Sequence, residues 1–179
     1  MRAPPPAALV CLDLQRARVA GTASPTSARI TENCRQVLLE ARARRWPVLH
    51  VHRREASPDG ARPIPGLEPL PSEPVFLRPG PSAFSHQAFA RQATALGGPL
   101  ALIGFSLIDS VLATAFAAAD LKLPVEVLCD AVAADPRDDG ALGHALFAPL
   151  AALAPLCRLI AARDLFQEDA AAYAAANAP

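Results

Sequence analysis

Several residue types are scarce in this chain of 179 residues. Aromatic residues make up only 5% of it, and Lys122 is the only lysine, so Arg supplies nearly all of the positive charge. Acidic and basic residues balance to a formal net charge of zero, which removes the electrostatic basis for binding nucleic acid or an anionic membrane. We therefore expect no nucleic acid and no membrane as partners.

Long hydrophobic runs are also missing. The apolar run over residues 99–108 is too short to cross a membrane, and the stretch that follows it carries Asp109 and Asp120. Three prolines at positions 4–6 do not form the apolar centre of a signal peptide. The expected location is the cytoplasm.

Cysteine is present but never as a C-x-x-C pair. The four positions are far apart: Cys11, Cys34, Cys129 and Cys157. Cys11 and Cys129 lie inside apolar runs, so buried free thiols are expected rather than disulfides or a zinc site. Free thiols also fit a reducing cytoplasm.

Hydrophobic residues, in contrast, make up 52% of the chain, enough for the core of one domain that spans residues 1–179. Apolar runs of strand length alternate with stretches of helical spacing, which predicts a parallel sheet covered by helices. The predicted strands are 7–12, 48–52, 75–77, 100–103, 125–129 and 157–161. The predicted helices are 30–44, 82 or 85 to 97, 108–121, 140–153 and 165–177. Residues 55–74, rich in Pro, Gly and Asp, predict a long loop.

Polar residues that follow the strands are candidates for chemistry, because open parallel sheets bind ligands at the carboxyl ends of their strands. Asp13 ends the first strand, where burial would make its carboxylate suitable for proton transfer. Alternatively, Asp13 only caps the loop at the end of this strand. Gly104 permits a sharp turn after the fourth strand. Ser110 then falls near the start of a helix, where free backbone N–H groups can stabilise an oxyanion. Alternatively, Ser106 caps this helix and Ser110 is an ordinary helix residue.

Three motifs follow one another along the chain. Residues 9–15 end in Asp-x-Gln, residues 78–84 read Arg-Pro-Gly-Pro-Ser-Ala-Phe, and residues 103–115 run from Ile-Gly through Ser-Val to Thr-Ala. In this order and spacing they resemble the Asp-x-Gln, Lys-x-x-x-Ser-x-Phe and Gly-x-x-Thr-x-x-Cys-Val-x-x-Thr-Ala segments of the isochorismatase-like (cysteine) hydrolases. The resemblance covers nearly the whole chain. It implies a three-layer α/β/α fold with a mostly parallel six-stranded sheet in the order 3-2-1-4-5-6.

The resemblance also implies a catalytic site for a small-molecule substrate. The Asp, Lys and Cys of the family's triad fall on Asp13, Arg78 and Ser110, so this triad is atypical at two of its three positions. A serine hydroxyl ionises less readily than a thiol and needs a well-placed base. Arg78 keeps the positive charge of the lysine but cannot transfer a proton.

Further residues of the site are implied in the same way. A cis peptide bond is expected between Phe105 and Ser106, where it helps to build the oxyanion site. These two residues, together with Gln15 and Phe84, are the expected substrate-binding residues.

A metal site is not expected. Related nicotinamidases hold a metal through an Asp-x-His strand end, and His50 and His52 could share one side of the second strand here. Two arginines follow at once, and no carboxylate is placed as in those relatives. We expect no metal and no cofactor, with one histidine packed and the other half exposed.

Three functions remain open. The first is a hydrolase in which Ser110 attacks an amide-like carbon, with Asp13 as base and Arg78 as electrostatic support. The second is cleavage of an enol ether with Asp13 as proton donor and no nucleophile. The third is a non-catalytic pocket for a small molecule or partner. The family commonly forms homo-oligomers, and the Ala-rich helix over 111–119 offers a smooth apolar face, so we expect a homo-oligomer, a dimer or larger.

Overall fold

Six apolar runs form the strands of one sheet in the computed structural model, which describes residues 5–20, 25–133 and 143–167. The strands are β1 (Ala8–Leu12), β2 (Val48–Arg53), β3 (Val75–Arg78), β4 (Leu100–Phe105), β5 (Val125–Ala133) and β6 (Cys157–Ile160). Every neighbouring pair is parallel, and the order is β3-β2-β1-β4-β5-β6. The predicted fold and strand order are confirmed.

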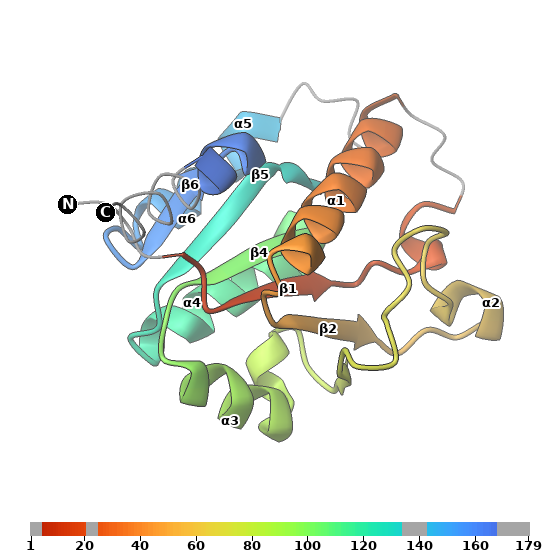
Figure 1. The fold of residues 1–179 in the computed structure, drawn as a ribbon, viewed down its shortest axis with the longest axis horizontal. Coiled ribbons are helices and arrows are strands. Elements are labelled where there is room, and N and C mark those ends of the chain that lie inside the picture. Colours follow the sequence, from red (N-terminus) through yellow and green to blue (C-terminus); the bar gives the residue numbers. More distant parts are fainter. Residues whose placement is uncertain (1–4, 21–24, 134–142, 168–179) are drawn as a thin grey trace, which may run out of the picture.

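Helices cover both faces of this sheet. The principal ones are α1 (Pro25–Ala43), α3 (Gln87–Leu96) and α4 (Leu112–Asp120). The short ones are η1 (Arg16–Arg18), α2 (Pro58–Ala61), η2 (Ala83–Ser85), η3 (Leu107–Val111), α5 (Gly143–Leu146) and α6 (Ala148–Ala151). Helix α1 crosses one face, and α3 and α4 lie on the other (Figure 1). The sheet is therefore the middle of three layers.

Each face of the sheet carries its own hydrophobic core. Alternate residues of the central strands divide between them: Val10 and Leu12 pack toward α3 and α4, whereas Leu9 and Cys11 pack toward α1. Strands buried on both faces have nearly continuous apolar sequences. This is why the apolar runs located the strands so well.

The first helix begins earlier than the predicted start at Ile30. It starts at Pro25, a residue suited to the first turn of a helix because it has no N–H to leave unpaired. Ile30 is the first large apolar side chain that α1 buries. Apolar spacing therefore reveals the packed part of the helix and not its first turn.

The strand β5 continues beyond its predicted end at residue 129. Its pairing with β4 shifts register between Leu102 and Gly104, and the strand resumes as far as Ala133. Asp130 therefore lies within the strand and not after it. Its carboxylate accepts a hydrogen bond from the backbone N–H of Ala162 at 2.9 Å, a structural role.

The predicted loop at 55–74 is fixed to the body of the molecule. It contains the short helix α2, and the side chains of Ile64 and Leu67 are buried in the core beneath α1. Two apolar anchors of this kind hold the middle of a long loop in place.

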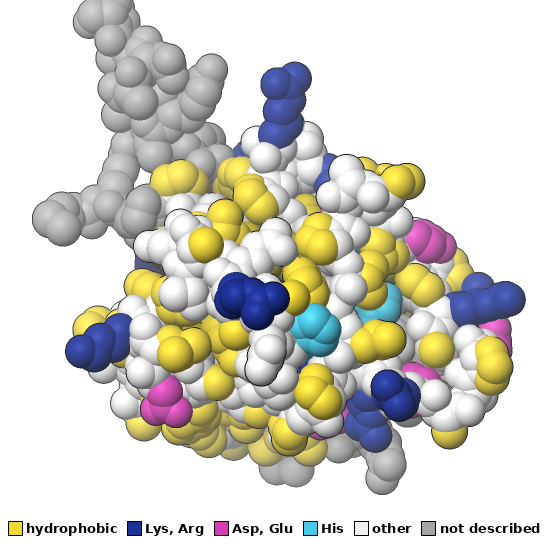
Figure 2. Space-filling model, turned by 90° about the horizontal axis from the view of Figure 1, so that it is seen from below, with side chains coloured by type: hydrophobic (Ala, Val, Ile, Leu, Met, Phe, Trp, Pro, Cys, Tyr) yellow, Lys and Arg dark blue, Asp and Glu magenta, His cyan; other side chains and the backbone are white. Residues whose placement is uncertain are grey.

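The predicted helix at 140–153 appears in the described part as α5 and α6. Residues 134–142 and 168–179 lie outside the described residues, as does most of the predicted last helix. Among the described residues, no helix is long and apolar enough to cross a membrane. On the face seen in Figure 2, hydrophobic side chains are spread among charged ones and do not form one continuous patch.

Candidate active site

The chain turns sharply where β1 ends, at Asp13. This residue has a φ of 51°, in the left-handed region that Asp adopts more readily than most residues with a side chain. Its backbone N–H donates to the carbonyl of Val51 at 2.8 Å, so β2 holds the turn in place. The carboxylate is fully buried and therefore requires a cation or hydrogen-bond donors.

Arg78, the last residue of β3, supplies both. Its Nη2 lies 2.7 Å from Oδ2 of Asp13 and its Nε lies 3.2 Å from Oδ1, a bidentate ion pair. Its Nη1 donates to the carbonyl of Gly80 at 2.6 Å. Burial by itself lowers the pKa of Arg78, but the hydrogen bonds and charge of Asp13 outweigh this and raise it. The expected contact between these two residues is present, and it is shielded from water.

The turn after β4 brings the third candidate to the same edge of the sheet. Gly104 has a φ of 132°, and a Cβ at this position would lie 1.9 Å from the carbonyl oxygen of Leu12. Only glycine allows β4 to approach the end of β1 so closely. The peptide bond between Phe105 and Ser106, one residue further along, is cis, as the resemblance implied.

Ser110 lies in the short π-helical segment η3 that follows this turn. It is fully buried, and its Oγ is 3.4 Å from the carbonyl oxygens of both Phe105 and Ser106. Within the described part of the chain, its hydroxyl makes no hydrogen bond to Asp13 or Arg78. Ser110 thus lies at the same edge of the sheet as the ion pair but is not hydrogen-bonded to it.

The expected substrate-binding residues occupy different environments. The amide of Gln15 is engaged internally: Nε2 donates to the carbonyl of Arg53 at 2.9 Å, and Oε1 accepts from the N–H of the same residue at 2.9 Å. Phe105 and Ser106 are buried at the turn, whereas Phe84 is half-buried. The substrate-binding role of these four residues stays a prediction.

A cluster of charges missed by the sequence reasoning lies over the ion pair, centred on Asp109. Its Oδ2 is 2.8 Å from Nη1 of Arg53 and 3.5 Å from Nη2 of Arg18, and its Oδ1 is 3.7 Å from Nη2 of Arg78. Glu55 completes the cluster, with Oε1 3.4 Å from Nη2 of Arg18. Two signals for this cluster were available in the sequence: Asp109 is next to Ser110, and Arg53 follows an apolar strand. Nothing in the sequence pointed to Arg18.

The two histidines of β2 are both buried, so the expectation that one is half exposed is wrong. His50 and His52 face the core under α1, because Ile64 and Leu67 of the long loop close over this side of the sheet. Burial lowers the pKa of His50, and lowers that of His52 to about 4. Among the described residues, no group of three or more His, Cys, Asp and Glu side chains is arranged to hold a metal ion.

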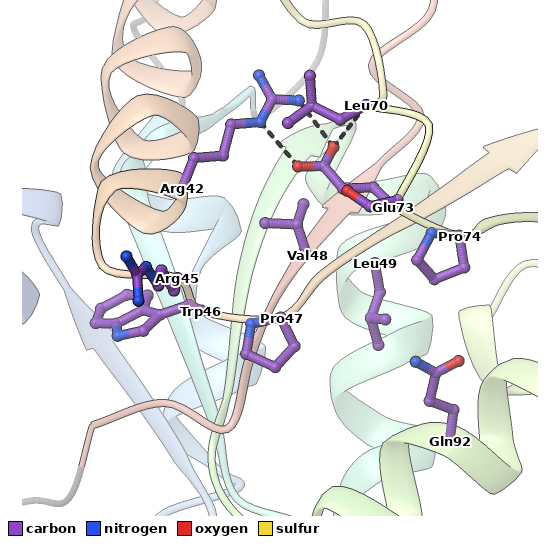
Figure 3. A pocket seen from close by; sticks show the side chains of 11 residues that line it. Arg42, Arg45, Trp46, Pro47, Val48, Leu49, Leu70, Glu73, Pro74 and Gln92 are labelled. Carbon is purple, nitrogen blue, oxygen red and sulfur yellow. Dashed lines mark hydrogen bonds and ion pairs between the residues drawn. The ribbon is translucent and has the colours of Figure 1, made fainter.

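A pocket of about 300 Å³ lies at the opposite edge of the sheet, at the amino ends of β2 and β3 (Figure 3). Glu73 lines it, and Arg42 binds both carboxylate oxygens of Glu73 at 2.8 Å. The N–H of Leu70 and Nε2 of His50 each lie 2.9 Å from Oε2 of the same carboxylate. Open parallel sheets bind ligands at the carboxyl ends of their strands. We therefore place the candidate active site at Asp13 and not in this pocket.

Comparison with solved structures supports the fold. The chain superposes with a TM-score of 0.80 on a protein of the isochorismatase family from Chromobacterium violaceum, at 24% identity, over 96% of this chain and 100% of that one. An isochorismatase from Pseudomonas putida superposes with a TM-score of 0.78 at 23% identity, over 90% of this chain and 93% of that one. The N-carbamoylsarcosine amidase of Thermoplasma acidophilum superposes with a TM-score of 0.72 at 22% identity, over 89% of this chain and 97% of that one.

Comparison of sequences identifies the family. No curated protein sequence matches this chain significantly. The family model that describes the isochorismatase domain matches residues 7–158, which include every candidate site residue named above. This protein therefore belongs to the isochorismatase family.

Proposed function

We propose that this protein is a hydrolase that acts on a small amide-like or enol-ether substrate through Asp13, Arg78 and Ser110. The observation that carries the proposal is the buried bidentate pair between Asp13 and Arg78 at the carboxyl edge of the sheet. A charged pair sealed from water is costly to form, and such pairs cluster at functional sites. The similarity to an N-carbamoylsarcosine amidase agrees with amide chemistry.

For an amide-like substrate, each residue has a chemical role. The Oγ of Ser110 attacks the carbonyl carbon while its proton passes to Asp13, and Arg78 offsets the resulting change of charge. The tetrahedral intermediate collapses as Asp13 returns this proton to the departing amine. Water then attacks the acyl carbon and gives a proton to Asp13, which passes it to Oγ of Ser110 as the carboxylic acid leaves. Each carboxylate oxygen of Asp13 can accept more than one hydrogen bond, so its contacts with Arg78 leave room for this proton.

For an enol ether, Asp13 would instead donate a proton to carbon and Ser110 would take no part. This route is favoured by one observation, the absence of a hydrogen bond between Ser110 and Asp13 among the described residues. The bidentate contact with Arg78 favours the first route, because a cation beside both oxygens suits a carboxylate that accepts a proton.

Substitution separates the two routes. The assay uses the wild-type protein and its Ser110→Ala and Asp13→Asn variants on panels of small amides, carbamates and enol ethers. If Ser110 is the nucleophile, we expect Ser110→Ala to abolish turnover. If Asp13 is the proton donor, Ser110→Ala keeps most of the turnover and Asp13→Asn removes it. Turnover that survives both substitutions would contradict the proposal.

A non-catalytic binding protein is the second candidate. The observation in its favour is that Ser110 is fully buried and bonded only to backbone carbonyls of its own segment, in the part of the chain that the structure describes. Under this alternative, no substrate of the panel turns over, while ligands still raise the melting temperature of the protein.

We also propose a homo-oligomer in the cytoplasm. Phe116 and Leu121 expose their side chains on and just after the Ala-rich helix α4, a surface that a second copy could cover. The four cysteines are free, which agrees with a reducing compartment. Light scattering at micromolar concentration tests the assembly, and a monomer would count against it.

A further inference from the structure

Asp109 occupies an unusual position at the outer side of the candidate site. Its carboxylate lies within 4 Å of three guanidinium groups, which belong to Arg18, Arg53 and Arg78. The last of these also holds Asp13, so Asp109 covers the buried ion pair from the solvent side. Of Asp109, Arg78 and Asp13, Asp109 is the side chain that water reaches most, at 31% exposure against 5% for Arg78 and 0% for Asp13.

The contacts of the cluster are incomplete. Only the bond between Asp109 and Arg53 is short, at 2.8 Å; the contacts of Asp109 with Arg18 and Arg78 are 3.5 and 3.7 Å long. The other carboxylate of the cluster, that of Glu55, also makes only long contacts, at 3.4 Å with Arg18 and 3.8 Å with Arg53. Moreover, Nε of Arg18 is buried and makes no hydrogen bond with any residue that the structure describes. A buried donor without an acceptor is costly, and one explanation for it is a ligand.

The side chains of the cluster differ in how far water reaches them. The side chains of Asp109 and Arg53 are 31% and 44% exposed, whereas that of Arg78 is 5% exposed. A side chain of Asp109 turned toward water would regain hydration, whereas Arg78 is enclosed and bonded to both oxygens of Asp13. Exchange of one carboxylate for another between the same arginines leaves the charge of the cluster unchanged, so it avoids the cost of an unpaired buried charge.

We propose that Arg18, Arg53 and Arg78 form a carboxylate-binding subsite, which Asp109 fills in the free protein and a carboxylate of the substrate fills in the complex. The inference rests on the proposed function and names its substrate class: small amides or enol ethers that carry a carboxylate. Asp109 makes the subsite selective for anions over neutral compounds. A neutral compound cannot replace the negative charge of Asp109 beside the three arginines, so it does not displace this side chain.

Chemical rescue tests the subsite without any assay of turnover. The Asp109→Ala variant vacates the subsite, and formate is a carboxylate small enough to enter it. We expect formate to raise the melting temperature of this variant by roughly 4 °C at ten times its dissociation constant. Neutral formamide, and sodium chloride at equal ionic strength, should have no such effect. Wild type, whose subsite is filled, should need at least tenfold more formate.

A matched control tests whether formate binds at any aspartate position that lies between arginines. Asp59 also lies within 4 Å of two arginines, Arg16 and Arg62, but its side chain is 71% exposed. Water screens such a site, so Asp59→Ala should gain no stabilisation by formate. In the double variant Asp109→Ala, Arg53→Gln, the stabilisation seen with Asp109→Ala should be lost.

Two outcomes overturn the inference: no shift with formate in Asp109→Ala, or an equal shift when Arg53 is also replaced. If Asp109→Ala does not fold alone, refolding in formate and in formamide asks the same question. Native circular dichroism recovered with formate alone supports the subsite, and recovery with neither contradicts it. The proposed function fails separately, through turnover that survives Ser110→Ala and Asp13→Asn.

Discussion

The two ends of the strands β2 and β3 carry contrasting clusters of charge. At the amino end, the carboxylate of Glu73 is saturated, with hydrogen bonds from Arg42, Leu70 and His50 between 2.8 and 2.9 Å. At the carboxyl end, Asp109 makes one short contact and two long ones. A saturated cluster fixes structure, whereas an incomplete one leaves groups available to a ligand. We therefore expect the amino-end cluster to contribute stability and the carboxyl-end cluster to bind a ligand.

The largest effect is expected at the saturated end. The substitution Glu73→Gln leaves Arg42 without its carboxylate, and removal of one partner from a buried pair costs about 3–5 kcal/mol of unfolding free energy. Because Arg42 is partly exposed, we expect the lower end of this range, about 3 kcal/mol, in urea unfolding.

The control for Glu73 is Glu40, which pairs with Arg44 one helical turn away on the surface of α1. Glu40→Gln should cost less than about 0.5 kcal/mol. Equal losses for the two variants would show that the amino-end cluster has no special structural role.

The second effect concerns pH, and it arises from the buried histidines of β2. Burial lowers the pKa of His52 to about 4, from 6.5 in the unfolded chain, and lowers that of His50 as well. A lowered pKa means that the stabilisation is complete above pH 6.5 and is lost as the pH falls toward 4. For His52 alone the loss is about 3 kcal/mol at pH 4 and below.

The measurement is the free energy of unfolding between pH 7 and pH 4, in the wild type and in His52→Leu. The groups that face His52 are His50 beside it on β2 and, beyond that ring, the Glu73 carboxylate bound to His50. In His52→Leu the slope with pH should be clearly shallower. An unchanged slope would assign the acid sensitivity to other groups.

A smaller effect is expected at the incomplete end. The substitution Asp109→Asn keeps the shape of the side chain and removes its charge, so it should change the unfolding free energy by less than about 1 kcal/mol. Urea unfolding measures this directly. A loss as large as that of Glu73→Gln would make both clusters structural and would remove the contrast between the two ends.

Most of the fold could be predicted from the sequence, because the central strands are buried on both faces and have nearly continuous apolar sequences. The resemblance supplied the strand order, and it placed Asp13 and Arg78, which are 65 positions apart in the sequence, in one site. Three features were missed for physical reasons. The first turn of α1 buries little, and the register shift in β5 leaves no local signal. The loop after β2 is rich in Pro, Gly and Asp, a composition typical of the surface, although it buries Ile64 and Leu67.

The Asp109 cluster could not be predicted from the sequence either. Its contact with Arg53 joins residues 56 positions apart, and it depends on side-chain positions that only the turn after β4 determines. Arginines at strand ends are common surface residues, and nothing in the pattern distinguished Arg18 from Arg16 beside it. The chemistry of the site therefore depends on contacts between side chains that periodicity does not encode.

The reactivity of a thiol at position 110 tests the central claim most directly. The native thiols give little background, because burial raises the pKa of Cys11, Cys34 and Cys129, and raises that of Cys157 to about 11. In Ser110→Cys, burial acts on the thiol as well, but here the start of the helix and the charge of Arg78 at the same edge of the sheet both favour a thiolate. Mass spectrometry after iodoacetamide at pH 7 should show one new thiol, at position 110, that is alkylated faster than a free thiol. The paired variant Ser110→Cys, Arg78→Lys should react faster still, because the compact ammonium fits a smaller space. Alkylation at position 110 no faster than that of a free thiol would contradict the account.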